Sequence, residues 1–349
     1  MNFFHSFIVT NFWLADLLED VSCPPDWGLR VIDDPSSRFW VSRDGRGRSE
    51  RSYPADIDEQ YRIINKEVPA KEIIIEAKDQ DTADNVLNLI ETGIILVYPN
   101  SSDCPDEGVT VPVTGHSPCF MKDKPFVDRF SFHDSALYGC NAAEKAWGDN
   151  SLIYSMEKYK RSFRMDSFTP HSASPRYGQV FMNERNDYRY HVNAGFAIVI
   201  AYSVIEELGL EIRSSAKNPR FIDGEWNDKV HQDVADRLRD SGVEPGEDFT
   251  WILRGPATEL QEEMWQHLKT VDDFSETEEV RDVEMNIIEA LHAASILRNF
   301  IFAHRFDKVA ESVSPYDVHN MQTLARRLIL NTLGLFDVDD EKVTGIFRP

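Results

Sequence analysis

Cysteine is scarce in this sequence, and its spacing matches no metal or redox motif. The 349 residues contain four cysteines, and no two of them form a C-x-x-C pair. Structural zinc sites and thioredoxin-like redox pairs use that spacing, so neither is indicated. We therefore predict a cytoplasmic protein with reduced thiols, without a metal centre and without a cofactor. The four positions are Cys23, Cys104, Cys119 and Cys140.

Positive charge is also in short supply. Lys and Arg total 37 against 60 Asp and Glu, which gives a formal net charge of -23 and a pI near 4.8. A protein that binds duplex nucleic acid over a broad surface needs a basic face, so this composition argues against that class. Three explanations of the acidity stay open, namely solubility, a basic protein partner and mimicry of a nucleic acid.

Long hydrophobic runs are missing as well. The strongest candidate for a membrane span, Val192 to Ile205, has fourteen residues without a charge, whereas a spanning helix needs about 20. The N-terminal stretch has no basic leader and reaches Asp16 before any small-residue cleavage site. That is not the pattern of a signal peptide. We expect no membrane association, and we interpret Val192 to Ile205 as a buried helix.

The sequence does have enough apolar content for a large core. Its residues are 42% hydrophobic and 11% aromatic, and its length suggests two domains. Residues 1–150 alternate short apolar runs with turn residues, which predicts a mixed α/β region with a sensing or regulatory role. One helix in it is predicted to start at a cap from Asp81 or Thr82 and to stop at Gly93. The predicted strands are 38–44, 72–77 and 94–100.

Residues 151–185 are predicted to form a linker that begins with a basic helix. The stretch KYKRSFR interleaves basic residues with Tyr159 and Phe163, a mixture that single-stranded RNA binding uses. Two interpretations remain open, an RNA-binding strip and a helix with one solvated face. The basic residues are Lys158, Lys160, Arg161 and Arg164.

Residues 186–337 are predicted to form an all-helical bundle, and residues 338–349 a tail. Apolar residues recur there at helical spacing, and Ser314 with Pro315 marks one helix start. Amphipathic helices joined by loops pack antiparallel. The predicted fold class is therefore α+β, a mixed α/β region followed by a helical bundle. The predicted helices are 192–211, 223–242, 258–271, 278–306 and 314–334.

The helix predicted at 278–306 carries polar groups where packing is expected. Arg298 falls on the apolar stripe, seven residues after Leu291. Burying an unpaired guanidinium costs several kcal/mol, so such side chains need partners, water or a second protein surface. A neighbouring polar strip consists of His292, Ser295 and Asn299.

Two interpretations fit these polar groups. In the first, Arg298 pairs with Glu206 or Glu207 of the first long helix, and His304 is a core or helix-end histidine. In the second, Arg298 and His304 act together. Six residues on an ideal helix rotate by about 600°, which leaves these two side chains about 120° apart. A distorted helix end or a symmetry-related copy is then needed to bring them to one site.

The order Arg298, Asn299, four residues, His304 resembles the signature of the HEPN family (higher eukaryotes and prokaryotes nucleotide-binding). The helix order from about Asp187 to Leu335 is similar to the HEPN bundle. The resemblance implies a metal-independent endoribonuclease that works as a homodimer. In it, His304 moves a proton, Arg298 stabilises charge on the phosphorane, and Asn299 orients the phosphate or the histidine. The candidate supporting residues are Glu206, Glu207 and His292.

The first part of the chain is similar to the N-terminal regions of larger HEPN proteins in bacterial defence systems. This implies a regulated toxin or antiviral effector of the abortive-infection kind, which cleaves RNA through its 2'-hydroxyl. An inhibitory or trigger protein would be a further partner. Two alternatives stay open, a non-catalytic HEPN-like binding module for a protein or nucleotide, and an acidic nucleic-acid mimic.

Overall fold

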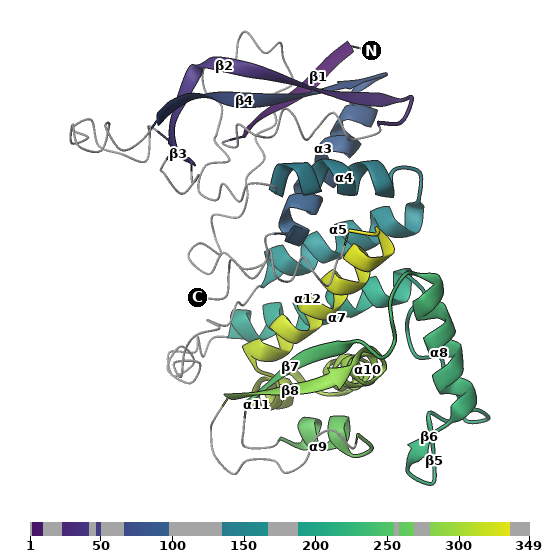
Figure 1. The fold of residues 1–349 in the computed structure, drawn as a ribbon. Helices are drawn as coiled ribbons and strands as arrows, with labels where there is room; N and C mark the ends of the chain where they lie inside the picture. The colour runs from purple at the N-terminus through teal and green to yellow at the C-terminus, as the bar shows by residue number, and fades with distance from the viewer. Residues whose placement is uncertain are drawn as a thin grey trace. The chain divides into compact units, whose positions relative to one another are not determined.

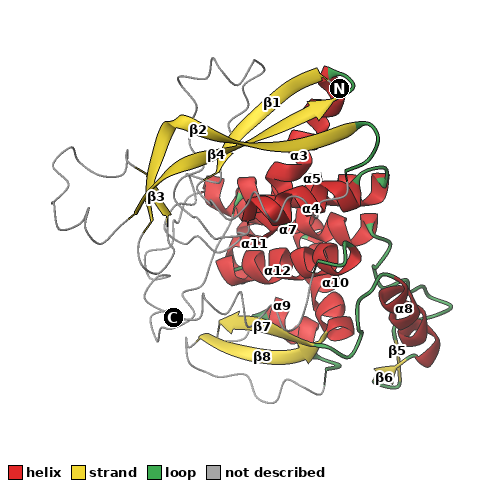
Figure 2. Cartoon of the chain, turned by 45° about the horizontal axis from the view of Figure 1, so that its top comes forward, coloured by secondary structure: helices red, strands yellow, loops and turns green. Residues whose placement is uncertain are grey.

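A computed structural model of the chain describes residues 2–9, 23–41, 47–49, 66–97, 135–166, 188–254, 258–268 and 280–335. These residues are mostly helical, with small antiparallel sheets, as the α+β class predicts (Figures 1 and 2). None of the described helices has the length and apolar character to cross a membrane. Two compact units result: unit 1 is Met1–Pro99 with Asp106–Asn150, and unit 2 is Asn100–Pro105 with Ser151–Pro349.

Unit 1 contains a four-stranded antiparallel sheet with the strand order β1-β4-β2-β3 (Figure 1). Strands β2 and β4 pair along their length, and the register shifts once, between Asp34 and Arg38. Pro35 lies in this interval and has no N–H for a regular ladder, which explains the irregularity. The bounds are Asn2–Val9 for β1, Trp27–Val41 for β2, Gly47–Ser49 for β3 and Lys66–Ala77 for β4.

Two of the predicted strands are present in this sheet. The segment 72–77 forms the end of β4, and 38–41 forms the end of β2, while 42–44 lies outside the described residues. Ile74 and Ile75 of β4 are fully buried. Helix α3 (Gln80–Val97) contacts β1, β2 and β4, so the sheet and this helix share a core.

Helix α3 begins two or three residues earlier than the sequence predicted. The Asp79 carboxylate accepts a hydrogen bond from the Thr82 backbone N–H at 2.8 Å, and bonds from Thr82 lower the pKa of Asp79. Asp79 is therefore the N-cap, and the prediction of Asp81 or Thr82 was wrong. The apolar face is as predicted, since Ala83, Val86, Leu87 and Ile90 are all buried.

Gly93 lies inside α3 rather than at its end. The helix continues to Val97, so the stop at Gly93 and the strand that should follow it were wrong. A Cβ atom on Gly93 would lie 2.7 Å from the Cα of Gly139 in α4 (Ser135–Ala146), and one on Gly139 would lie 2.7 Å from the Ile90 carbonyl oxygen. The two glycines thus allow α3 and α4 to pack backbone against backbone.

This contact predicts the effect of adding one methyl group. Gly93→Ala should lower the free energy of unfolding by about 1–3 kcal/mol, because the backbone of α4 must move away. Gly246→Ala is the control, because a Cβ atom there would meet nothing within 4 Å. Urea unfolding followed by tryptophan fluorescence measures both, with Trp27 and Trp147 6.0 Å apart in unit 1 as reporters. Equal stability of the two variants would contradict the close packing.

Unit 2 is arranged around α10 (Ile287–Ala303). This helix contacts α7, α8, α9, α11, α12 and two strands, and eleven of its residues are buried. Asn286 caps it in a reciprocal capping box with Glu289. The other helices are α5 (Asn150–Met165), α7 (Tyr188–Glu207), α8 (Asp228–Asp240), α9 (Glu259–Trp265), α11 (Phe306–Ser312) and α12 (Pro315–Thr332).

The prediction that this part is all helical was wrong, because β7 (Asp248–Arg254) and β8 (Val280–Asn286) form an antiparallel pair (Figure 2). The helix predicted from 278 therefore begins only at Ile287. In β8, Val283 and Met285 are buried between exposed residues, an alternation of period two that marks a half-buried strand.

A second short hairpin replaces the predicted start of α8. Strands β5 (Phe221–Ile222) and β6 (Glu225–Trp226) flank Asp223 at φ 52° and Gly224 at φ 87°, the left-handed pair that a type I′ turn requires. Asp223 therefore lies in the turn of this hairpin and is not the N-cap of α8. The N-cap of α8 is Asn227. By contrast, the predicted start of α12 at Ser314 and Pro315 is confirmed.

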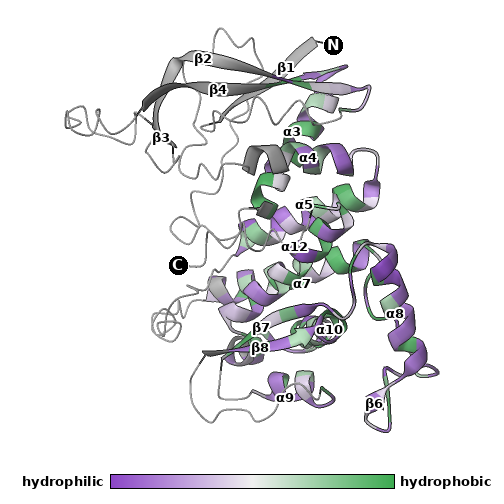
Figure 3. Ribbon diagram, in the orientation of Figure 1, coloured by the Kyte–Doolittle hydropathy of each residue, from purple (hydrophilic) through white to green (hydrophobic). Residues whose placement is uncertain are grey.

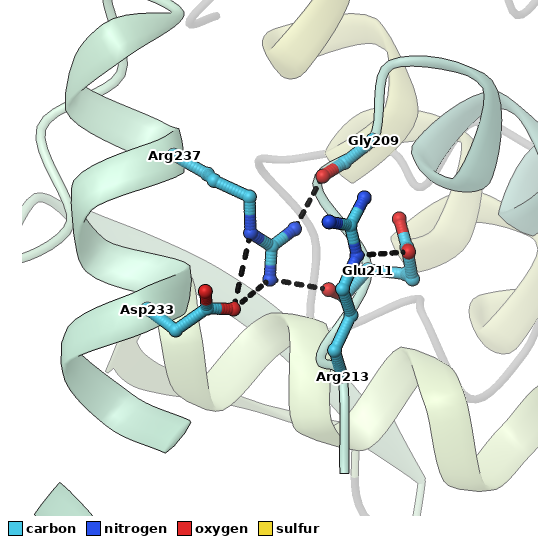
Figure 4. Close-up of polar contacts among 5 residues, drawn as sticks. All are labelled: Gly209, Glu211, Arg213, Asp233 and Arg237. Carbon is cyan, nitrogen blue, oxygen red and sulfur yellow. Dashed lines mark hydrogen bonds and ion pairs between the residues drawn. The ribbon is translucent and has the colours of Figure 1, made fainter. Parts of the chain in front are cut away.

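Arg237 attaches α8 to the segment that follows α7 (Figure 4). Most of α8 is hydrophilic (Figure 3), and its buried residues are Val230, Val234, Ala235 and Leu238. The Arg237 guanidinium donates to the carbonyl oxygen of Gly209, to that of Glu211 at 2.9 Å and to the Asp233 carboxylate at 2.9 Å. The Glu211 carboxylate in turn pairs with Arg213 at 2.7 Å. The Arg237 side chain thus donates to acceptors both on α8 and on the segment that follows α7.

Two arginines of α8 allow a matched test of this attachment. Arg237→Met should lower the free energy of unfolding by about 2 kcal/mol, because the two carbonyl groups lose their donor. Arg239→Met should cost less than about 0.5 kcal/mol, because that side chain is 51% exposed and pairs only with Asp236 at 3.0 Å. Denaturant unfolding of both variants measures the difference, and equal losses would show that Arg237 adds nothing beyond a surface charge.

Candidate functional site

Arg298 lies near the C-terminal end of α10 and reaches toward α7. Its Nη2 donates to Glu206 Oε1 at 2.7 Å, and its Nη1 donates to Asn299 Oδ1 at 2.9 Å. The guanidinium carbon lies 5.3 Å from the centre of the Tyr202 ring and 5.2 Å from that of Phe302. The pairing with Glu206 is thus the one predicted from helix periodicity. Because the Arg298 side chain is still 32% exposed, it also remains open to a ligand.

Glu207 serves a different neighbour from Glu206. Its carboxylate accepts a hydrogen bond from Lys158 Nζ of α5 at 2.6 Å, and Lys158 also donates to the Ser203 carbonyl oxygen at 3.2 Å. The Glu207 carbonyl oxygen accepts from Ser151 Oγ at 2.5 Å. The two adjacent glutamates therefore tie α7 to two helices, α10 and α5, and the structure places Glu207 with α5 rather than with Arg298.

His304 terminates α10 as its C-cap, which confirms the interpretation of a helix-end histidine. Its ring stacks on Phe300 at 4.3 Å between centres, and Nδ1 lies 3.1 Å from the Phe300 carbonyl oxygen. A carbonyl oxygen only accepts, so Nδ1 must carry a proton. In the neutral ring Nε2 is then the proton acceptor, and no described residue forms a hydrogen bond with it.

The structure does not join Arg298 and His304 through a shared contact within one chain. The contacts of Arg298 lie on α7 and α10, whereas His304 stacks on Phe300. Near His304, Lys308 of α11 pairs with Glu259 of α9 at 2.8 Å. Lys308 above all, and to a smaller extent the charge of His304, lower the pKa of Glu259.

The basic residues of α5 do not form a continuous RNA-binding strip. The Lys160 side chain is 3% exposed and pairs with Glu157 at 3.1 Å, while burial lowers its pKa. The prediction for Lys160 was therefore wrong, whereas Lys158 is 33% exposed and bound to α7 as described above, so RNA binding by this residue stays a prediction. Arg161 and Arg164 are exposed, and Arg161 pairs with Glu157 at 2.9 Å. The interpretation of a helix with one solvated face fits better.

His292 was a candidate supporting residue, but it belongs to a second cluster. Its side chain is buried, and its Nδ1 lies 2.7 Å from Nη1 of Arg220, which also donates to Ser295 Oγ at 2.6 Å. The rings of Phe221 and Trp226 meet the imidazole edge to face at 5.0 and 5.7 Å. No sequence motif pointed to Arg220. The Asp-Gly hairpin that follows it was the one available signal.

The protonation state of His292 follows from this geometry. A guanidinium only donates, so Nδ1 accepts, the ring is neutral and its proton lies on Nε2. Burial first, then the charges of Arg220 and His267, lower the pKa of His292 to about 3, while the Met264 backbone acts in the opposite direction. Among the described residues Nε2 has no partner of good hydrogen-bond geometry.

This lowered pKa predicts a pH-dependent stability. Between pH 6.5 and about 3 the unfolded chain binds a proton at His292 that the folded chain does not, so acidification favours unfolding. His292→Gln keeps an acceptor for Arg220 and removes the titration. Its free energy of unfolding should fall by about 2 kcal/mol less than that of the wild type between pH 7 and pH 5. Urea unfolding at both pH values tests this. If the wild type and His292→Gln lose the same free energy of unfolding between pH 7 and pH 5, the buried neutral ring is contradicted.

The described residues contain no group of three or more His, Cys, Asp or Glu side chains that could hold a metal ion. Cys23 and Cys140 are free thiols, and burial raises the pKa of both. Cys104 and Cys119 lie outside the described residues. Comparison of the chain with protein-family models, with curated proteins and with solved structures finds no match. A proposal about function therefore rests on the side-chain contacts in unit 2.

Proposed function

We propose that the chain is a metal-independent endoribonuclease of the HEPN type that acts as a homodimer. The observation that carries the proposal is the orientation of His304, whose Nδ1 is bonded to the Phe300 carbonyl oxygen and whose Nε2 is open. A positioned imidazole of this kind can accept and donate a proton, which suits general acid–base chemistry. Arg298, a partly exposed cation on the same helix end, suits the binding of phosphate.

The proposed reaction uses the 2'-hydroxyl of RNA as the nucleophile. Nε2 of His304 takes the proton of the hydroxyl while its oxygen attacks the adjacent phosphorus. The bond from phosphorus to the 5'-oxygen breaks, and the leaving oxygen receives a proton from a second imidazolium, the partner's His304. Arg298 stabilises charge on the phosphorane, and Asn299 orients the phosphate. The products are a 2',3'-cyclic phosphate and a 5'-hydroxyl end.

Exposed aromatic side chains on α10 and α7 support the homodimer. Phe302 is 65% exposed and Phe196 of α7 is 46% exposed, and Phe196 meets Phe306 at 5.8 Å. Apolar groups of this size at the surface are typical of protein interfaces. A second copy that packs on these side chains would bring Arg298 and His304 of both copies to one place. Within one chain, the structure joins the two residues through no shared contact.

The proposal predicts RNA cleavage that survives chelation. Purified protein in EDTA should cut a labelled RNA, leaving 2',3'-cyclic phosphate ends, and should leave the matching DNA intact because DNA lacks the nucleophile. His304→Ala and Arg298→Ala should each slow cleavage by about 10²-fold or more. Arg239→Ala, which removes an exposed arginine of α8, should cleave at the wild-type rate.

The outcomes separate this proposal from its alternatives. If folded wild-type protein leaves RNA intact, or if both variants cleave normally, the ribonuclease proposal is wrong. A non-catalytic binding module would then bind a protein or nucleotide without cleavage. An acidic mimic would instead bind a basic partner, with an affinity that falls steeply as salt is added.

For unit 1 we propose that it senses a trigger or restrains the nuclease.

A further inference from the structure

Arg220 is partly buried, yet it forms no ion pair with a described carboxylate, whereas seven other arginines of the described chain do. Asp and Glu outnumber Lys and Arg by 60 to 37, so acidic partners are plentiful in this sequence. Nevertheless, every hydrogen bond that Arg220 forms with a described residue goes to a neutral group. The ion pairs of other arginines are Arg30–Glu76, Arg161–Glu157, Arg213–Glu211, Arg237–Asp233, Arg239–Asp236, Arg298–Glu206 and Arg327–Glu247.

The neighbours of Arg220 cannot neutralise its charge. His292 is neutral because its Nδ1 accepts from Arg220 at 2.7 Å. Ser295 accepts from Arg220 at 2.6 Å and donates its own proton to the His292 carbonyl oxygen at 2.7 Å. Burial lowers the pKa of Arg220, and of the described groups only the ionisation of Tyr202 acts in the opposite direction. A largely enclosed positive charge is therefore left without a counter-ion among the described residues.

The guanidinium still has donors to offer. Both contacts with α10 use Nη1, while Nε and Nη2 form no hydrogen bond with any described residue. Neither atom is among the fully buried polar atoms that lack a partner, so both keep some accessible surface. Nε and Nη2 form one edge of the guanidinium, the fork that binds two oxygens of an oxyanion at once. His292 and Ser295 fix the plane of the guanidinium and so aim this fork.

Tyr202 supplies a further donor next to the fork. Burial above all raises its pKa to about 12, so the hydroxyl keeps its proton, and it forms no hydrogen bond with a described residue. The charges of Glu206 and Glu211 also raise its pKa, while those of Arg220 and Arg298 lower it, so Tyr202 lies within electrostatic range of the two arginines. Glu206 is paired with Arg298, so Arg220 is the cation near this hydroxyl that has no carboxylate partner among the described residues.

We propose that Arg220 anchors an oxyanion site for a phosphate group, which is bound by its Nε and Nη2 and by the Tyr202 hydroxyl. A carboxylate would fill the fork with both of its oxygens, whereas a phosphate has further oxygens for the hydroxyl. The site is separate from His304 and stands whether or not the chain cleaves RNA.

Titration of the full-length protein with inorganic phosphate tests the site, with acetate as the carboxylate probe. The wild type should bind phosphate with a saturable isotherm and acetate at least tenfold more weakly. Arg220→Met should weaken phosphate binding at least tenfold, and Arg220→Lys by a smaller factor, because a point charge replaces the fork. Arg239→Met, the exposed control, should bind as the wild type does.

A second substitution keeps the test decisive if Arg220→Met does not fold, since that change leaves two buried acceptors on α10 without their donor. Tyr202→Phe keeps the ring and removes only the hydroxyl, and it should weaken phosphate binding about threefold to tenfold with acetate binding unchanged. Absence of saturable phosphate binding by the wild type would overturn the proposal. Unchanged binding by a folded Arg220 variant, or equal affinity for acetate and phosphate, would do so too.

Discussion

The need to find partners for polar groups on a buried helix governs unit 2. Helix α10 is enclosed by helices and strands on most of its surface, so each polar side chain on it needs an acceptor, a donor or a path to water. Asn286 and Glu289 satisfy its first turn. Arg220 meets its middle, and Glu206 meets Arg298 near its end. The packing of α7 and of the β5–β6 hairpin follows from these contacts as much as from apolar burial.

Helical periodicity predicted those parts of the fold in which local signals agree. The capped start of α12 and the apolar face of α3 are examples, because cap residues and spacing point to the same element. The prediction failed where a tertiary contact overrides a local signal. Gly93 usually marks a helix end, but here it allows α4 to approach α3. The apolar spacing predicts a helix from 278, but Val280–Asn286 form β8, in which the buried Val283 and Met285 alternate as in a strand.

The candidate site was predictable only in part. An arginine on an apolar stripe implies a carboxylate on the facing helix, and Glu206 fulfils that expectation. One of the two interpretations of the sequence placed His304 at a helix end, and the structure makes it the C-cap of α10. Arg220 comes from a distant segment, and it reaches α10 because a two-residue turn at Asp223 folds the hairpin back. Long-range placement of this kind leaves no periodic trace in a sequence.

The ion pair of Arg298 also shapes how this arginine would meet a ligand. Glu206 is a carboxylate held beside the Arg298 guanidinium by the packing of α7 against α10. Its effective concentration there does not depend on the concentration of anions in solution. A phosphate that approaches Arg298 competes with this carboxylate. Phosphate binding by Arg298 therefore depends on how easily the Arg298–Glu206 ion pair breaks, and a small rotation of α7, which carries Glu206, would change that.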